Sequence, residues 1–265
     1  ILVSSTGVIG EVFDPNIIIK SFKNILKSKK IDLIKAASSI MTTDTFPKTA
    51  SHSVKIDNNI IRIYGIAKGS GMIFPNMGTM LSYIFVEANL SKGILKKILH
   101  TNLDTSFNSI SVDSDTSTSD TLMLFSLSDN NQQKIKSPNI INKISLGLKE
   151  VMSDLALQII SDGEGISKLI EVKVSGAKTY KQATEVSFSI ANSPLVKTAI
   201  AGEDPNWGRV IMAIGKAGPK INLKKLTIKF GNLIIVQAGK LNQNYDEKLT
   251  ANYMKDENIE ITIET

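Results

Sequence analysis

The chain has 265 residues, and 42% of them are hydrophobic, so it can bury a sizeable core in one large domain or two ordinary ones. Its formal charge of +6 is spread along the chain, which argues against nucleic-acid binding. The absence of cysteine excludes disulfides, thiolate nucleophiles and cysteine-ligated zinc, and two histidines, His52 and His100, are too few for a histidine-rich metal site. Any nucleophile must therefore be a serine, threonine, lysine or carboxylate.

No apolar run in the chain approaches the roughly 20 residues that a membrane span needs. The first residues also lack the basic start of a signal peptide. We therefore expect a protein of the cytoplasm, or of an organelle matrix in a eukaryote, that has no membrane partner.

The first predicted elements are a strand over residues 1–5, a helix that begins at Asp14 and Pro15, and a second helix over about residues 31–40. Two apolar segments then flank residues 57–59, where an aspartate and two asparagines signal a hairpin. The apolar face expected of the first helix comprises Ile18, Phe22, Ile25 and Leu26.

A glycine-rich loop follows the hairpin, and residues 68–81 read KGSGMIFPNMGTML. Periodicity then predicts a strand over residues 79–86, a helix over residues 91–103 and a strand over residues 122–127. The polar residues 128–139 are typical of a loop.

The rest of the chain continues to mix helices and strands without a strict alternation. This pattern predicts an α+β (mixed α/β) fold with a change of domain near residues 166–175. The expected elements are a long helix after residue 139, a strand over residues 168–174, a helix near 181–190, a strand over 209–215, two strands around Gly231, a short helix near 245–254 and a last strand over 260–264.

Thr79 follows Gly78 at the start of an apolar strand, where a threonine is ordinarily structural. The glycine changes this interpretation, because it allows strained backbone that suits attack by a hydroxyl on the preceding carbonyl. Cleavage of the Gly78–Thr79 bond would give Thr79 an α-amine with a pKa of about 7.7 to 8.0, near enough to neutrality to act as base for its own hydroxyl. One residue would then supply both nucleophile and base.

Two further segments offer groups for acyl chemistry. In SSTGVIGE, Thr6 and Gly7 could supply a hydroxyl and a backbone N–H to an oxyanion, and one such donor is worth about 3 kcal/mol of barrier. Gly7 could equally serve only to turn the chain. In MTTDTFPK, Thr43 and Thr45 would face the same way in an extended chain and could bind a polar substrate, although a solvated loop fits as well.

Six segments, taken in order, resemble the signature blocks of the bifunctional arginine-biosynthesis acetyltransferases, known as glutamate N-acetyltransferase or ornithine acetyltransferase. The segments span nearly the whole chain and read SSTGVIGE, MTTDTFPK, GIAKGSGMIFPNMGTML, SVDSDTSTSDT, DGEGISKLIEVKVSGA and SPLVKTAIAGEDPNWGRV. The resemblance implies a layered sandwich like that of the N-terminal nucleophile enzymes, with a catalytic domain over residues 1–165 and a second, smaller α/β domain over residues 166–265.

The resemblance further implies a precursor that cleaves itself between Gly78 and Thr79. The resulting α and β chains would stay together and assemble as a dimer of heterodimers. Thr79 would take acetyl from N-acetylornithine, release ornithine and pass the acetyl group to glutamate in a ping-pong exchange. No metal or diffusible cofactor is implied, and acetyl-CoA would be a second acetyl donor if the protein is bifunctional.

By the same resemblance, Thr6 and Gly7 form the oxyanion hole, and a threonine of the TTDT segment, Thr43 or Thr45, binds substrate together with Lys68 and Glu164. The chemistry of these side chains fits, since Lys68 can pair with the α-carboxylate of either substrate and Glu164 with a free α-amine. The structural alternatives are that Lys68 is a solvated lysine and that Glu164 only decorates a turn.

The sequence departs from the family pattern at both ends and at three internal positions. Family members carry a segment before the SSTGVIGE block and a tail after the last strand, where an asparagine and a threonine complete the substrate pocket. Ser114 and Ser119 stand where glycine and asparagine are usual, and Gly78 where alanine is common. Two other functions therefore stay open, which are an inactive or incomplete fragment of this enzyme and an amidohydrolase or aminopeptidase on the same self-cleaving scaffold.

Overall fold

The computed structural model describes residues 2–8, 10–25, 27, 32–74, 80–129 and 132–265. The chain divides into two compact units, Ile1–Glu164 and Gly165–Thr265. Two predicted cleavage positions, Gly78 and Thr79, lie outside the described residues. None of the described helices is long and apolar enough to cross a membrane.

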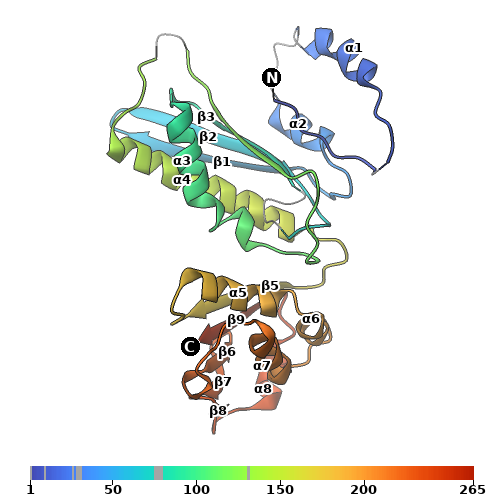
Figure 1. Cartoon of the computed structure of the whole chain (residues 1–265), viewed down its shortest axis with the longest axis vertical. Coiled ribbons are helices and arrows are strands. Elements are labelled where there is room, and N and C mark those ends of the chain that lie inside the picture. Colours follow the sequence, from blue (N-terminus) through green and yellow to red (C-terminus); the bar gives the residue numbers. More distant parts are fainter. Residues whose placement is uncertain (1, 9, 26, 28–31, 75–79, 130–131) are drawn as a thin grey trace. The chain divides into compact units, whose positions relative to one another are not determined.

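The first unit contains a four-stranded sheet in the order β1-β2-β3-β4 (Figure 1). Its strands are β1 (Lys48–Ile56), β2 (Asn59–Lys68), β3 (Leu81–Val86) and β4 (Thr121–Ser126). The strand β2 runs antiparallel to both β1 and β3, whereas β4 runs parallel to β3. The predicted hairpin is confirmed, and Asp57 supplies the left-handed residue of its turn with a φ of 52°.

Two helices pack on this sheet and on each other, and they build the core of the unit. The long helix α4 (Pro138–Ile160) lies against β1 and β2, and α3 (Lys92–Leu103) lies against α4 (Figure 1). A Cβ atom at Gly147 of α4 would lie 2.5 Å from Val54 Cγ2, so the helix approaches the sheet closely there. The largest apolar side chains of this core include Ile63, Ile84, Ile144, Leu148, Met152, Leu155 and the Phe107 ring of the short 3-10 helix η1 (Phe107–Ser109).

The N-terminal part of the chain forms α1 (Pro15–Ile25) and α2 (Leu33–Ser39), which confirms the two predicted helices. Asp32 caps α2 by accepting a hydrogen bond from the Lys35 N–H at 3.0 Å. The expected apolar face of α1 is exposed at Ile18, Phe22 and Ile25, and Leu26 lies outside the described residues.

The strand predicted over residues 1–5 is wrong for the described residues 2–5, which have no regular structure. Leu2 and Val3 are largely exposed, so the apolar side chains that suggested a strand are not buried on a sheet. The segment has no partner strand among the described residues, and an isolated strand is not stable by itself.

The second unit contains a five-stranded sheet in the order β5-β9-β6-β7-β8. Its strands are β5 (Leu169–Ser175), β6 (Thr227–Phe230), β7 (Leu233–Gln237), β8 (Lys240–Leu241) and β9 (Asn258–Glu264). The strand β5 pairs parallel with β9, and every other pair is antiparallel. The remaining elements of this unit are α5 (Tyr180–Ala191), α6 (Pro194–Ala201), α7 (Trp207–Lys216), η2 (Leu223–Lys225) and α8 (Glu247–Tyr253).

The strand predicted over residues 209–215 is wrong, because these residues belong to α7. A short apolar run fits a buried strand and a buried helix equally well when only its hydrophobicity is considered. The helix begins where Asn206 accepts a hydrogen bond from the Arg209 N–H. Val210, Ala213 and Ile214 are buried, and this spacing of three and four residues is that of a helix face.

Candidate active site

Lys68 ends β2 and is only 4% exposed, so its ammonium group lies inside the first unit. Its Nζ donates a hydrogen bond to Thr42 Oγ1 at 3.4 Å. Burial lowers the pKa of Lys68, and the negative charges of Asp44 and Asp120 partly oppose this shift. A buried lysine without an ion-pair partner within 4.0 Å among the described residues is suited to hold the carboxylate of a ligand.

A buried ion cluster formed by Asp44, Lys48 and Asp162 lies beside this lysine. Lys48 begins β1 and is 0% exposed, and its Nζ lies 2.6 Å from Asp44 Oδ1 and 2.6 Å from Asp162 Oδ2. Burial by itself raises the pKa of both carboxyl groups, but hydrogen bonds outweigh it and the pKa of each lies below its ordinary value. Both acids are therefore held in the charged form that pairs with Lys48.

Asp44 joins the residue after Lys68 to the segment that contains Thr42. Its carboxylate accepts hydrogen bonds from the Gly69 N–H at 2.7 Å and from the Thr42 N–H at 3.1 Å. Gly69 has a φ of 150°, a conformation that other residues rarely adopt. The position of Lys68 beside Thr42 is therefore fixed by the backbone as well as by charge.

Asp162 joins the turn after α4 to the segment that contains Thr45 and Lys48. It accepts hydrogen bonds from the backbone N–H of Thr45 at 2.9 Å and from the Thr45 hydroxyl. Its own carbonyl accepts a hydrogen bond from the Ser70 hydroxyl at 2.5 Å, and the Glu164 N–H donates to the Ser70 carbonyl at 3.0 Å. The Glu164 side chain is exposed and lies against Gly71, where an added Cβ would lie 2.7 Å from its carboxyl carbon.

These contacts bring three of the predicted substrate-binding residues, Thr45, Lys68 and Glu164, into one hydrogen-bonded region. Thr43 is exposed. Thr43 and Thr45 were predicted to face the same way because alternate side chains of an extended chain share a face. Residues 41–46 contain bends instead of an extended chain, so this argument does not apply to them. The threonine beside Lys68 is Thr42, which sequence reasoning did not select.

Thr6 and Gly7 lie in the irregular N-terminal segment, where Thr6 is half-buried and Gly7 is exposed. Ser4 ties this segment to the sheet, since its Oγ lies 2.5 Å from the Tyr83 hydroxyl of β3. The hydrogen bonds found among the described residues do not link Thr6 or Gly7 to Lys68. Their expected role as an oxyanion hole stays a prediction.

Asp120 lies at the same end of the sheet as Lys68, one residue before β4. Both of its carboxylate oxygens are enclosed and accept no hydrogen bond within the described part of the chain. Burial raises the pKa of Asp120 to about 6, while the Met80 N–H and the Lys68 charge partly oppose the shift. The Met80 amide acts here by proximity, without hydrogen-bond geometry. Asp120 belongs to the SVDSDTSTSDT segment but was not among the residues predicted to be functional.

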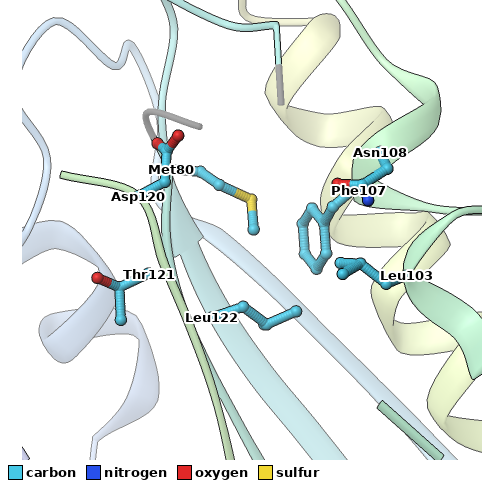
Figure 2. A pocket seen from close by; sticks show the side chains of 7 residues that line it. All are labelled: Met80, Leu103, Phe107, Asn108, Asp120, Thr121 and Leu122. Carbon is cyan, nitrogen blue, oxygen red and sulfur yellow. The ribbon is translucent and has the colours of Figure 1, made fainter. Parts of the chain in front are cut away.

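A small pocket adjoins this carboxyl group. Figure 2 shows Asp120 beside Met80, with the Phe107 ring on the other side of the Met80 side chain. Met80 is buried, and its carbonyl accepts a hydrogen bond from the Thr121 N–H at 2.9 Å. The lining residues are Met80, Leu103, Phe107, Asn108, Asp120, Thr121 and Leu122. Among the described residues, including those that line this pocket, no three acidic or histidine side chains are grouped so that they could hold a metal ion.

The chain matches the model of the ArgJ family over residues 1–265. It is 45% identical over 265 residues to the arginine biosynthesis bifunctional protein ArgJ of Ruegeria pomeroyi, and the match covers 100% of this chain and 64% of that protein. The protein of the same name from Gluconobacter oxydans is 44% identical over 267 residues, with 100% of this chain and 63% of that protein covered. The chain thus spans less than two thirds of the length of these relatives.

The crystal structure of an arginine biosynthesis bifunctional protein ArgJ from Bacillus halodurans is similar to this chain with a TM-score of 0.58. The two share 34% sequence identity, and the likeness covers 67% of this chain and 84% of that chain. It confirms the predicted mixed α/β fold of the N-terminal nucleophile type.

Proposed function

Since the chain belongs to the ArgJ family, we propose that it carries the acetyl-transfer site of an arginine-biosynthesis enzyme that moves acetyl from N-acetylornithine to glutamate. The structural observation that carries this proposal is the buried Lys68, held beside Thr42 and Asp44 at the end of β2. Lys68 pairs across the sheet with Leu81, which lies two positions after Thr79 in the sequence. Lys68 thus ends the strand next to β3, and the first residue of β3 follows the proposed nucleophile by two positions in the sequence.

The proposed nucleophile arises by self-cleavage. The Thr79 hydroxyl attacks the Gly78 carbonyl, the peptide bond is replaced by an ester, and water then hydrolyses the ester. The products are a first chain that ends at Gly78 and a second chain that begins with the free α-amine of Thr79. This amine accepts the proton of the Thr79 hydroxyl when the hydroxyl attacks a substrate.

Acetyl transfer then takes two half-reactions. Thr79 Oγ attacks the acetyl carbonyl of N-acetylornithine, and the bond to the α-nitrogen breaks to release ornithine and leave acetyl-Thr79. In the second half, the α-amine of glutamate attacks the acetyl ester and frees Thr79. The Thr6 hydroxyl and the Gly7 N–H are the proposed donors to the oxyanion of both tetrahedral intermediates.

Substrate binding uses the charges around the sheet end. Lys68 pairs with the α-carboxylate that both substrates share, and Glu164 pairs with a free amine. Of the threonines, Thr42 has the best support for a binding role, because it already contacts the Lys68 ammonium group. Thr43 and Thr45 stay as alternatives.

The cleaved α and β chains are proposed to stay together in a dimer of heterodimers in the cytoplasm, without a metal or a diffusible cofactor. The relatives from Ruegeria pomeroyi and Gluconobacter oxydans are named bifunctional proteins. If this protein is bifunctional too, acetyl-CoA would be a second acetyl donor.

The proposal is tested by incubating the full protein with N-acetylornithine, with and without glutamate, and measuring the release of ornithine. Release that requires glutamate supports the acetyltransferase. Release that is independent of glutamate indicates an amidohydrolase on the same scaffold. No release from a folded protein indicates an inactive or incomplete enzyme.

A further inference from the structure

Lys68 and Asp120 carry opposite charges at one end of the sheet, and the strand register places them near each other. Lys68 pairs with Leu81 of β3, and Leu81 pairs with Thr121 of β4, which follows Asp120 directly. Each group acts electrostatically on the other. They do not form an ion pair in the described structure, so their charged atoms are more than 4.0 Å apart.

Neither charge is fully satisfied within the described part of the chain. Lys68 has a single weak hydrogen bond, to Thr42, and the oxygens of Asp120 accept none among the described residues. Asp44, the other acid that acts on Lys68, is already occupied by Lys48 and by two backbone N–H groups. A buried charge without a partner is costly, and a native structure that keeps one needs an explanation, such as a catalytic role or a bound molecule that completes it.

A ligand that bridges the two groups must carry an anion and a cation close together. The α-carbon of a free amino acid carries a carboxylate and an ammonium group, which match Lys68 and Asp120 respectively. N-acetylornithine lacks this cation, because its α-nitrogen is an uncharged amide. The site would therefore distinguish the free amino acid from its acetylated form at the nitrogen where the chemistry occurs.

Resting on the proposed function, but assigning the α-ammonium group to Asp120 in place of Glu164, we propose that Asp120 binds the α-ammonium group of the free amino acid and exchanges one proton with its nitrogen in each half-reaction. The first half-reaction converts an amide and a hydroxyl into an ester and an ammonium group, which consumes one proton. The second half-reaction converts an ester and an ammonium group into an amide and a hydroxyl, which releases one proton. Asp120 gives up a proton in the first and regains it in the second.

The burial of Asp120 fits this cycle, because its pKa of about 6 lets the carboxyl group exist in both forms near neutral pH. Lys68 is the charged side chain that acts on Asp120 among the described residues, and it opposes the shift. The α-ammonium group of a bound amino acid would favour the carboxylate form of Asp120, which is the form that pairs with it.

The test measures ligand binding to the full protein by calorimetry, so it does not depend on acetyl transfer. Asp120→Asn should weaken glutamate binding by about tenfold or more and change N-acetylornithine binding by less than about twofold. Asp120→Glu should restore part of the glutamate affinity. The matched control is Asp115→Asn, which makes the same chemical change at an exposed position of the same segment and should alter neither affinity.

The pH dependence gives a second readout. Wild-type affinity for glutamate should fall as the pH is lowered through about 6, and Asp120→Asn should lack this step. An equal loss for both ligands, or no loss for glutamate in a variant that unfolds no earlier than the wild type, would overturn the proposal. If the wild type binds glutamate but transfers no acetyl group, the proposed function fails while the result for Asp120 still stands.

Discussion

Lys48 and Asp162 lie 114 positions apart in the chain, and Lys48 Nζ is 2.6 Å from Asp162 Oδ2. The contact joins the start of β1 to the turn that follows α4. Asp44 completes the buried ion cluster and also accepts hydrogen bonds from the backbone of Gly69, which follows Lys68, and of Thr42, whose hydroxyl contacts Lys68. The cluster therefore holds the backbone around Lys68 in place. Removing one of its charges should lower both the stability of the protein and its affinity for substrate.

Replacing Asp44 should show how much the cluster stabilises the fold. Asp44→Asn leaves a buried lysine with one carboxylate instead of two, and we expect the free energy of unfolding at pH 7 to fall by about 3 kcal/mol. Urea denaturation of the wild type and the variant measures this change. The control is Asp32→Asn, which removes an exposed ion pair with Lys35 but keeps an N-cap, and should cost no more than about 0.5 kcal/mol. Similar losses in the two variants would contradict a special role for the cluster.

Replacing Asp120 should raise the free energy of unfolding, whereas replacing Asp44 should lower it. Its folded pKa of about 6 lies above the ordinary 3.8, so its favourable contribution is complete below about pH 3.8 and is lost as the pH rises through 6. Above pH 6 the carboxylate is buried without a hydrogen-bond partner, and Asp120→Asn should stabilise the ligand-free protein by roughly 1 kcal/mol at pH 8. The gain should shrink as the pH falls below 6. Unfolding curves recorded across this range would contradict the assignment if the variant were less stable at pH 8.

Lys68 should act mainly on substrate binding. Lys68→Ala removes the proposed partner of the α-carboxylate, so the Michaelis constants for N-acetylornithine and for glutamate should both rise by roughly 10- to 100-fold. Steady-state kinetics of the full protein measure both constants. Lys55→Ala, at an exposed position of β1, should leave them unchanged. A fall in turnover number alone would instead make Lys68 a participant in the chemistry.

The three threonines of the TTDT segment should respond differently when each is replaced by valine, which has nearly the same shape. The two quantities to compare are the Michaelis constants and the free energy of unfolding. Thr42→Val removes the hydroxyl that contacts Lys68 and should raise the Michaelis constants. Thr45→Val removes a donor to the buried Asp162 and should lower the free energy of unfolding by about 1 to 3 kcal/mol. Thr43→Val should be nearly neutral in both assays. A large kinetic effect at Thr43 would show that the ligand-bound site differs from the contacts described for residues 42–45.

Much of the fold follows from local signals in the sequence. The β1–β2 hairpin has a turn of polar residues between apolar strands, and α3 begins at Ser91, whose side chain accepts a hydrogen bond from the Ile94 N–H. The helix α7 was not predicted, since hydrophobicity alone cannot separate a buried helix from a strand over seven residues. The missing information is which side chains are buried together, and that depends on the other elements.

The site is predictable to a smaller extent. Lys68 and Glu164 were selected from the family resemblance, and their hydrogen-bonded neighbourhood agrees with a shared site. Lys48 was not selected, because a lysine after a proline ordinarily reads as exposed and its partner Asp162 is distant in sequence. Asp120 carries no local signal, since its unsatisfied oxygens appear only when β3, β4 and their neighbours are packed.

Mass spectrometry of the full protein shows directly whether acetyl passes through Thr79. We expect two chains that meet at the Gly78–Thr79 bond, and a second chain that gains the mass of one acetyl group with N-acetylornithine and loses it when glutamate is added. Peptide mapping should place that group on Thr79, and Thr79→Ala should stay uncut and unacetylated. An uncut wild-type chain, a cut Thr79→Ala variant, or an acetyl group that maps to another residue would contradict the account.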